Sequence, residues 1–244
     1  MDVALATREI FWQIPISFKI TMYVAMIISF AILGLGLFKK YKFVTQNSSL
    51  KDLAPDGLKM CNFFNTIFFT GKVTRDKQAG IFHSLIYYGF IVLLIATELV
   101  AIHADSPFKV YQGTTYIVIS FLADIAGILI LIGLALAFKR RYIDKPEYLS
   151  STNPNDEMKM YIMIFLLVFI GFLLEGFRIV GADFPAGEAT WSPIGWILAK
   201  VISSTGISDN SLATIYKGMW MFHMLNTMVF IASVGHTKFF HIIA

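Results

Sequence analysis

The sequence predicts an all-α membrane protein, a polytopic bundle of five transmembrane helices with one short helix at the outer membrane surface. Hydrophobic residues make up 57% of its 244 residues and charged residues only 15%, whereas about a quarter of a soluble domain is charged. The mean hydropathy is +0.68. A soluble domain of this size leaves much of its side-chain surface in water, so the composition excludes an ordinary soluble enzyme and a disordered chain. The one cysteine, Cys61, excludes an intramolecular disulfide and a cysteine-bound iron–sulfur cluster within this sequence.

Five apolar stretches are long enough to cross a hydrocarbon core, which requires about 20 helical residues. They cover residues 17–38, 81–103, 114–138, 160–180 and 215–240. Between the last two, residues 191–202 predict a short helix with a proline near its start and two tryptophans suited to the headgroup layer. We expect this helix either to rest at the outer interface or to cover a lipid-soluble substrate. Residues 1–244 are predicted to form a single transmembrane domain.

Basic residues are distributed unevenly along the chain and predict its orientation. The segments 39–80 and 139–159, together with Lys238, hold 14 of the 20 lysines and arginines. Because cytoplasmic loops are enriched in these residues, we expect an inner-membrane protein with its N-terminus outside and its C-terminus in the cytoplasm. The net charge of +4 reflects this asymmetry, and nothing else in the sequence indicates a nucleic-acid partner.

Two of the predicted spans carry histidines near both ends: His83 and His103 in the second, His223 and His241 in the fifth. Ionisable groups at membrane depth are costly, which favours a functional role, and neutral imidazole is a common axial ligand of haem iron. In a straight helix, the 18 residues from His223 to His241 make five turns and about 27 Å, so both rings face the same way. Because the second and fifth spans run antiparallel, the spacing predicts two bis-histidine haem sites, an inner one at His83/His241 and an outer one at His103/His223.

The outer pair requires a departure from straight helical geometry. Twenty residues rotate a helix by about 200°, so His83 and His103 face nearly opposite ways unless the helix bends or His103 lies in the following turn. His236 lies off the face shared by the other histidines of the fifth span, and we expect it to be a hydrogen-bonded side chain at the membrane edge.

A family resemblance accompanies these histidines. The segments Phe82-His83, Phe222-His223 and Thr237-Lys238-Phe239-Phe240-His241 resemble the gamma-subunit family of respiratory nitrate reductase. They also resemble its relatives: the membrane subunits of heterodisulfide reductases and of sulfite-reduction complexes, and the membrane domain of flavoprotein–quinone oxidoreductases. Residues 75–83, with Gly89-Phe90 after them, are most similar to the heterodisulfide-reductase-like branch.

The resemblance implies two b-type haems, and a quinone that exchanges electrons with the outer one. It implies that His83 and His241 hold the inner haem iron and that His223 is one ligand of the outer haem iron. The nitrate reductase branch has a further histidine ten residues after the first, where this chain has Leu93, so His103 is the substitute that we consider. The partner implied on the basic inner face is a cytoplasmic iron–sulfur or flavin protein, or a fused domain of that kind.

Quinone chemistry also requires proton exchange near the outer haem. The candidates for this role are Glu98, inside the second span, and Asp124, inside the third. Glu175 and Arg178 are spaced i, i+3 near the outer end of the fourth span and are expected to form an ion pair that neutralises both charges.

We therefore expect an electron-transfer subunit of a quinone-linked oxidoreductase complex. Two other classes remain open. A haem-free membrane anchor of a redox complex would explain the topology equally well but would leave the histidine positions to coincidence. A secondary transporter would use buried charges for coupling but would usually show internal repeats, which we do not find in the sequence.

Overall fold

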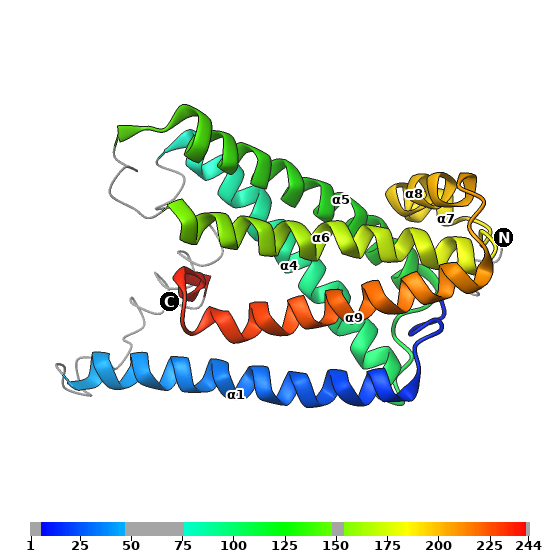
Figure 1. Ribbon diagram of the computed structural model, residues 1–244, viewed down its shortest axis with the longest axis horizontal. Coiled ribbons are helices and arrows are strands. Elements are labelled where there is room, and N and C mark those ends of the chain that lie inside the picture. Colours follow the sequence, from blue (N-terminus) through cyan, green and yellow to red (C-terminus); the bar gives the residue numbers. More distant parts are fainter. Residues whose placement is uncertain (1–5, 47–75, 148–153, 243–244) are drawn as a thin grey trace. The chain divides into compact units, whose positions relative to one another are not determined.

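The computed structural model describes residues 6–46, 76–147 and 154–242, except for the side chains of residues 44, 154, 241 and 242. Throughout these ranges the regular structure is helical, without β-strands (Figure 1). The described residues fall into two compact units. The first comprises residues 6–14 and 77–223, and the second comprises residues 15–76 and 224–244 as far as they are described. Helix α9 contributes its beginning to the first unit and its end to the second.

Seven α-helices lie in the described ranges, with one π-helix and one 3₁₀-helix. They are α1 (Ile16–Gln46), α4 (Lys77–Asp105), α5 (Gly113–Phe138), the π-helix η3 (Lys139–Asp144), α6 (Pro154–Gly181), α7 (Glu188–Trp191), α8 (Pro193–Ser204), α9 (Asp209–Val234) and the 3₁₀-helix η5 (Lys238–Ile242). Four are long and apolar enough to cross a membrane: α1, α4, α5 with η3, and α6. These four correspond to the first four predicted spans, and each is longer than its prediction.

The fifth predicted span is not confirmed. Helix α9 has 26 residues, which is long enough, but it is not among the helices that reach the hydropathy of a span. Lys217, His223 and Asn226 interrupt its apolar residues. The length of α9 therefore supports a fifth span, but its hydropathy does not.

The expectation of one continuous helix up to residue 240 is wrong, because α9 ends at Val234. Within the second unit, Gly235 lies against α1 so closely that a Cβ on Gly36 would be 2.8 Å from the Gly235 carbonyl. Next to it, the His236 Nε2 donates to the Ile32 carbonyl oxygen at 3.0 Å, which confirms the hydrogen-bonded role expected for His236. The chain then turns before η5, so the register that would align His223 with His241 is interrupted.

Small residues allow close helix packing in the first unit. A Cβ on Gly89 of α4 would meet the side chain of Ile130 on α5 at 2.7 Å, and a Cβ on Gly133 of α5 would meet the Phe82 carbonyl oxygen at 2.9 Å. On the other side of α5, the Phe172 ring of α6 lies over Gly127. These contacts bring α4, α5 and α6 together around a shared apolar core of Ile130, Leu134, Val168 and Phe172, against which Leu93 packs.

The outer connection folds back onto α6. A Cβ on Gly176 of α6 would lie 3.0 Å from Leu198 of α8, and a Cβ on Gly195 of α8 would lie 2.7 Å from the Glu175 side chain. Ile197 and Val201, on another side of α8, are exposed. The helix expected between residues 191 and 202 is therefore present, and one face of it packs against α6.

The segment before α1 closes this end of the first unit. The Gly113 N–H donates to the Ala6 carbonyl oxygen at 2.6 Å, and the Trp12 ring covers Gly181 at the end of α6. Trp12 also makes an edge-on contact with Tyr216 of α9, with ring centroids 4.9 Å apart. These contacts hold the segment in place and position Arg8.

Candidate functional site

The predicted haem ligands lie at different places on α4 and α9. His83 is in the second turn of α4, and its ring stacks on Tyr87 with centroids 6.1 Å apart. His223 lies beyond the middle of α9 and faces Gly171 of α6, where an added Cβ would lie 3.6 Å from the imidazole Cε1. The side chain of His241, in η5, lies outside the described residues, and His83 and His241 belong to different units.

His103 makes a hydrogen bond that bears on its chemistry. It lies near the end of α4, and its Nδ1 accepts a hydrogen bond from the Tyr111 N–H at 2.9 Å. In the neutral ring the proton is then on Nε2. A haem or metal ligand usually has the opposite arrangement, in which one ring nitrogen donates while the other binds the metal. The described state of His103 therefore fits an axial ligand poorly.

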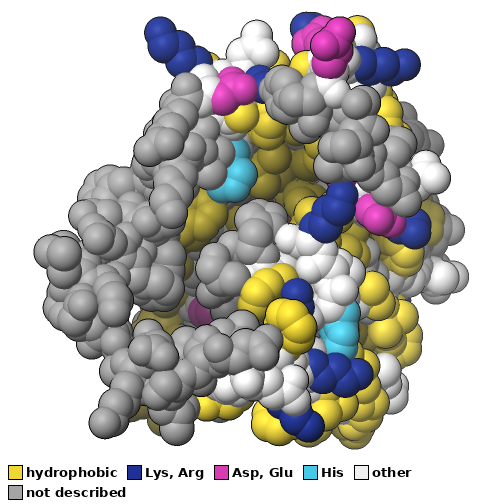
Figure 2. All heavy atoms as spheres, turned by 90° about the vertical axis from the view of Figure 1, so that its left-hand side faces the viewer, with side chains coloured by type: hydrophobic (Ala, Val, Ile, Leu, Met, Phe, Trp, Pro, Cys, Tyr) yellow, Lys and Arg dark blue, Asp and Glu magenta, His cyan; other side chains and the backbone are white. Residues whose placement is uncertain are grey.

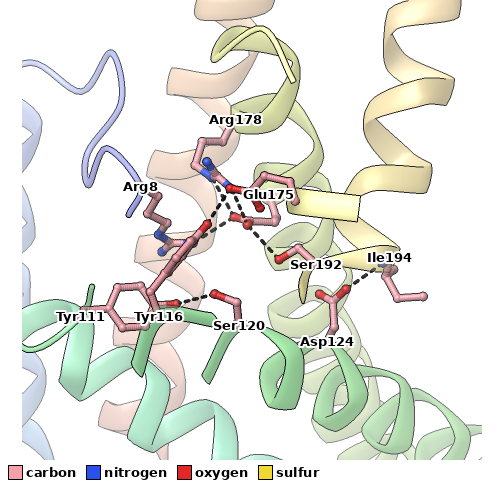
Figure 3. A network of polar contacts seen from close by, with 10 residues as sticks. Arg8, Tyr111, Tyr116, Ser120, Asp124, Glu175, Arg178, Ser192 and Ile194 are labelled. Carbon is pink, nitrogen blue, oxygen red and sulfur yellow. Dashed lines mark hydrogen bonds and ion pairs between the residues drawn. The ribbon is translucent and has the colours of Figure 1, made fainter. Parts of the chain in front are cut away.

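The structure brings together a buried polar network where α6 ends and α5 and α8 begin (Figure 3). The predicted Glu175–Arg178 pair is present and bidentate: Arg178 Nη2 donates to Glu175 Oε1 at 2.7 Å, and Arg178 Nε donates to Oε2 at 3.1 Å. Arg8 Nη1 also donates to Oε2, at 2.9 Å. Figure 3 shows both arginines pointing toward Glu175. Burial disfavours the charge of Arg8, but the Glu175 carboxylate together with Tyr111 and Tyr116 outweighs this effect and raises the pKa of Arg8 above its ordinary value.

Glu188, in the connection between α6 and α8, is with Arg8 a charged residue of this network that sequence reasoning missed. It is 1% exposed, and its Oε1 accepts from the Tyr116 hydroxyl at 2.6 Å and from Arg178 Nη2 at 2.9 Å. Among the described residues, its Oε2 has no hydrogen-bond partner. Arg178 therefore bridges two carboxylates, and the two arginines balance the charges of Glu175 and Glu188.

Asp124, one of the two predicted proton-handling residues, lies beside the beginning of α8. It is buried, and its Oδ2 accepts from the Ile194 N–H at 2.7 Å. A carboxylate at this place satisfies an otherwise unbonded amide and interacts favourably with the positive end of the helix dipole. Asp124 thus anchors α8 to α5.

Glu98, the other candidate, lies on α4 with an exposed side chain. It makes no contact with the buried polar network. The structure therefore brings Asp124 close to the network, through α8, and leaves Glu98 outside it.

Basic side chains gather where α4 and α6 begin and α5 ends. Figure 2 views this end and shows lysine and arginine side chains there in dark blue. Some are neutralised locally: Arg141 pairs with Glu157 at 2.6 Å, and Lys139 pairs with Asp144 at 2.9 Å. Arg140 Nη1 donates to the Gln78 side chain at 3.2 Å and joins η3 to α4.

Comparison with known proteins gives two relatives. Over 237 residues the chain is 29% identical to "EtfAB:quinone oxidoreductase" of Syntrophomonas wolfei subsp. wolfei, an alignment that covers 94% of this chain and 33% of that protein. Over 186 residues it is 28% identical to "Probable iron-sulfur-binding oxidoreductase FadF" of Bacillus subtilis, covering 73% of this chain and 24% of that protein. The chain therefore spans a third or less of the length of these relatives.

No family model matches the chain, and no solved structure matches it. Both relatives are oxidoreductases by name, and one is linked to quinone. The similarity supports a relation to quinone-linked oxidoreductases, but it does not single out the nitrate reductase gamma subunit, since neither relative is named as one.

Proposed function

We propose that this chain is the membrane electron-transfer part of a quinone-linked oxidoreductase. The observation that carries the proposal is the similarity to EtfAB:quinone oxidoreductase over 94% of the chain, because a match of that extent includes the helices that bear His83, His103 and His223. On this proposal α9 is a fifth span, the basic ends of the helices face the cytoplasm, and an iron–sulfur or flavin partner docks there. Quinone reacts at the opposite, outer side.

Some of the histidines of this chain are suited to bind haem b. Bound haem would supply one-electron transfer across the membrane. His83 and His241 are the proposed ligands of the inner haem. His223 is a proposed ligand of the outer haem, and its ring lies beside Gly171 of α6. His103 is the proposed second outer ligand, and to serve as one it must exchange the hydrogen bond from Tyr111.

On this proposal, charged residues of the chain lie on the side where quinone reacts. Glu98 and Asp124 remain proposed sites of proton exchange. The Arg8–Glu175–Arg178 cluster holds the segment before α1 against α6, and it places charge of both signs where α6 meets the outer connection.

The test is the haem content of the full chain purified from membranes of haem-supplemented cells. We expect b-type absorption bands after reduction by dithionite and two haems per chain. The His223→Ala variant should lose one haem, and His103→Ala should lose the same haem if His103 is its second ligand. His236→Ala is the matched control and should retain both, because that ring is bonded to the Ile32 carbonyl. A wild-type chain without haem would overturn the cytochrome proposal and favour a haem-free anchor.

A further inference from the structure

Three carboxyl groups are found in and beside the buried polar network, and they differ in how their oxygens are used. Glu175 has both oxygens engaged: Oε2 accepts from Arg8 and from Arg178, and Oε1 accepts from Arg178. A proton on either oxygen would displace an arginine donor. Glu175 is therefore held as an anion.

Asp124 is also committed to a structural contact. Its Oδ2 accepts the Ile194 N–H at the beginning of α8. Protonation would weaken this charge-assisted bond and remove the favourable interaction with the helix dipole.

Glu188 has a different arrangement. Both of its donors, Tyr116 and Arg178, bind Oε1, while Oε2 is buried and without a hydrogen-bond partner in the described part of the chain. A buried carboxylate oxygen without a partner is costly. A proton on Oε2 leaves both bonds to Oε1 in place and removes the negative charge from an oxygen that no described donor stabilises.

A second unsatisfied atom lies on the same short helix. Trp191, one turn after Glu188, is 8% exposed, and its Nε1–H has no acceptor among the described residues. This helical turn therefore carries one donor, the Trp191 Nε1–H, and one acceptor, the Glu188 Oε2, without partners in the part of the chain that the structure describes. A water molecule or a hydroxyl group can both accept and donate a hydrogen bond. The neighbouring Ala189 and Thr190 are exposed, so this short helix lies at the surface of the first unit while the Glu188 side chain points inward.

We propose that Glu188 is a further proton-exchanging carboxyl, in addition to the sites proposed above, with Oε2 as the atom that receives the proton. The proposal rests on the quinone-linked function above. In the step, the O–H bond of a quinol breaks, the electron pair stays on the quinol oxygen, and the proton forms an O–H bond with Oε2, directly or through one water. The products are a quinol anion and a neutral Glu188, and in quinone reduction the proton moves in the opposite direction.

The net charge of the cluster around Glu188 changes in this step. The groups that face it from neighbouring elements are Tyr116 of α5 and Arg178 of α6, and Arg178 is tied to Glu175 and through it to Arg8. With Glu188 ionised, two cations balance two anions. Once Glu188 is neutral, the cluster has one excess positive charge, which stabilises a nearby anion.

The test combines infrared spectroscopy with turnover. In the full-length wild type, acidification should give a difference band of a protonated carboxyl that is absent from Glu188→Gln. Tyr116→Phe, which removes one donor to Oε1 without removing the carboxyl, should keep the band but move its appearance to higher pH, because the carboxylate has lost a stabilising bond. If the band persists in Glu188→Gln, or if its pH dependence is unchanged in Tyr116→Phe, the proposal is wrong.

Quinol oxidation supplies the second measurement. Glu188→Gln should lower kcat by roughly 100-fold or more, the usual scale of general acid–base catalysis, with KM changed less than kcat and with partial recovery in Glu188→Asp. Asp183→Asn, an exposed carboxyl in the same connection, is the matched control and should keep wild-type turnover. Wild-type turnover in a folded Glu188→Gln variant that contains haem would overturn this inference alone. If the wild type lacks haem and quinol activity, the proposed function fails, and the infrared measurement still decides whether Glu188 exchanges protons.

Discussion

Replacing Arg178 by glutamine tests whether the buried polar network holds the outer end together. Arg178 is 4% exposed and makes three hydrogen bonds to two carboxylates, at 3.1, 2.7 and 2.9 Å. Removing one partner of a buried ion pair typically costs about 3–5 kcal/mol, because the remaining charge is left uncompensated. We expect Arg178→Gln to fall in this range, since Glu175 keeps Arg8 but Glu188 keeps only the Tyr116 hydroxyl.

The double variant shows where the cost arises. Adding Glu188→Gln to Arg178→Gln removes the carboxylate that has lost its cation, and it should restore about 1–3 kcal/mol, the penalty of an unsatisfied buried group. The two residues are in direct contact, so the effects of the two substitutions should not be additive.

The assay is equilibrium unfolding of the detergent-solubilised chain by titration with sodium dodecyl sulfate, followed by far-ultraviolet circular dichroism. Lys200→Gln is the matched control, because its ammonium group lies 4.3 Å from the Phe184 ring centroid and its loss should cost only about 0.5–1 kcal/mol. A cost below about 1 kcal/mol for Arg178→Gln, the range of a surface ion pair, would refute the reasoning. So would a double variant that is no more stable than the single one.

Three further outcomes follow from particular contacts. Asp124→Ala should cost about 1–3 kcal/mol, because the Ile194 N–H loses its acceptor, and hydrogen exchange should speed up at that amide. Gly36→Ala should cost about 1–3 kcal/mol in the same unfolding assay, since its Cβ would meet backbone at 2.8 Å, whereas Gly34→Ala should be neutral because nothing lies within 4 Å of its Cβ. Gly171→Leu should lower haem content, while Gly171→Ala should not, because a single Cβ there makes an ordinary contact at 3.6 Å.

Much of the fold could be predicted, because an apolar stretch of sufficient length identifies a membrane-spanning helix. Four of the predicted spans correspond to helices of the required length and hydropathy. The end of α9 could not be predicted in the same way. Residues 229–234 lead through Gly235-His236-Thr237-Lys238 to Phe239-Phe240, and Gly235, the residue after α9, lies against α1. Hydropathy does not report contacts between distant segments.

The candidate site could be predicted only where its residues are neighbours on one helix. The i, i+3 spacing of Glu175 and Arg178 identified their ion pair, and the structure confirms it. Arg8 reaches Glu175 across 167 residues, and Glu188 comes from the connection after α6, so no periodicity links them to the pair. Arg8 stands between Thr7 and Glu9, and Glu188 stands between Gly187 and Ala189, so neighbouring residues do not mark either of them.

The charged residues of the buried polar network and Glu98 differ in whether nearby opposite charges compensate them. Arg178 and Glu175 lie near the outer end of α6, and each is compensated by charges of opposite sign, so their presence is explained by packing alone. Glu98 is exposed on α4, a helix long and apolar enough to span a membrane. An exposed carboxylate on such a helix carries a cost in lipid that a neutral side chain would avoid. Since the described contacts do not offset that cost, a functional role explains Glu98 better than a structural one, whereas the reverse holds for Arg178.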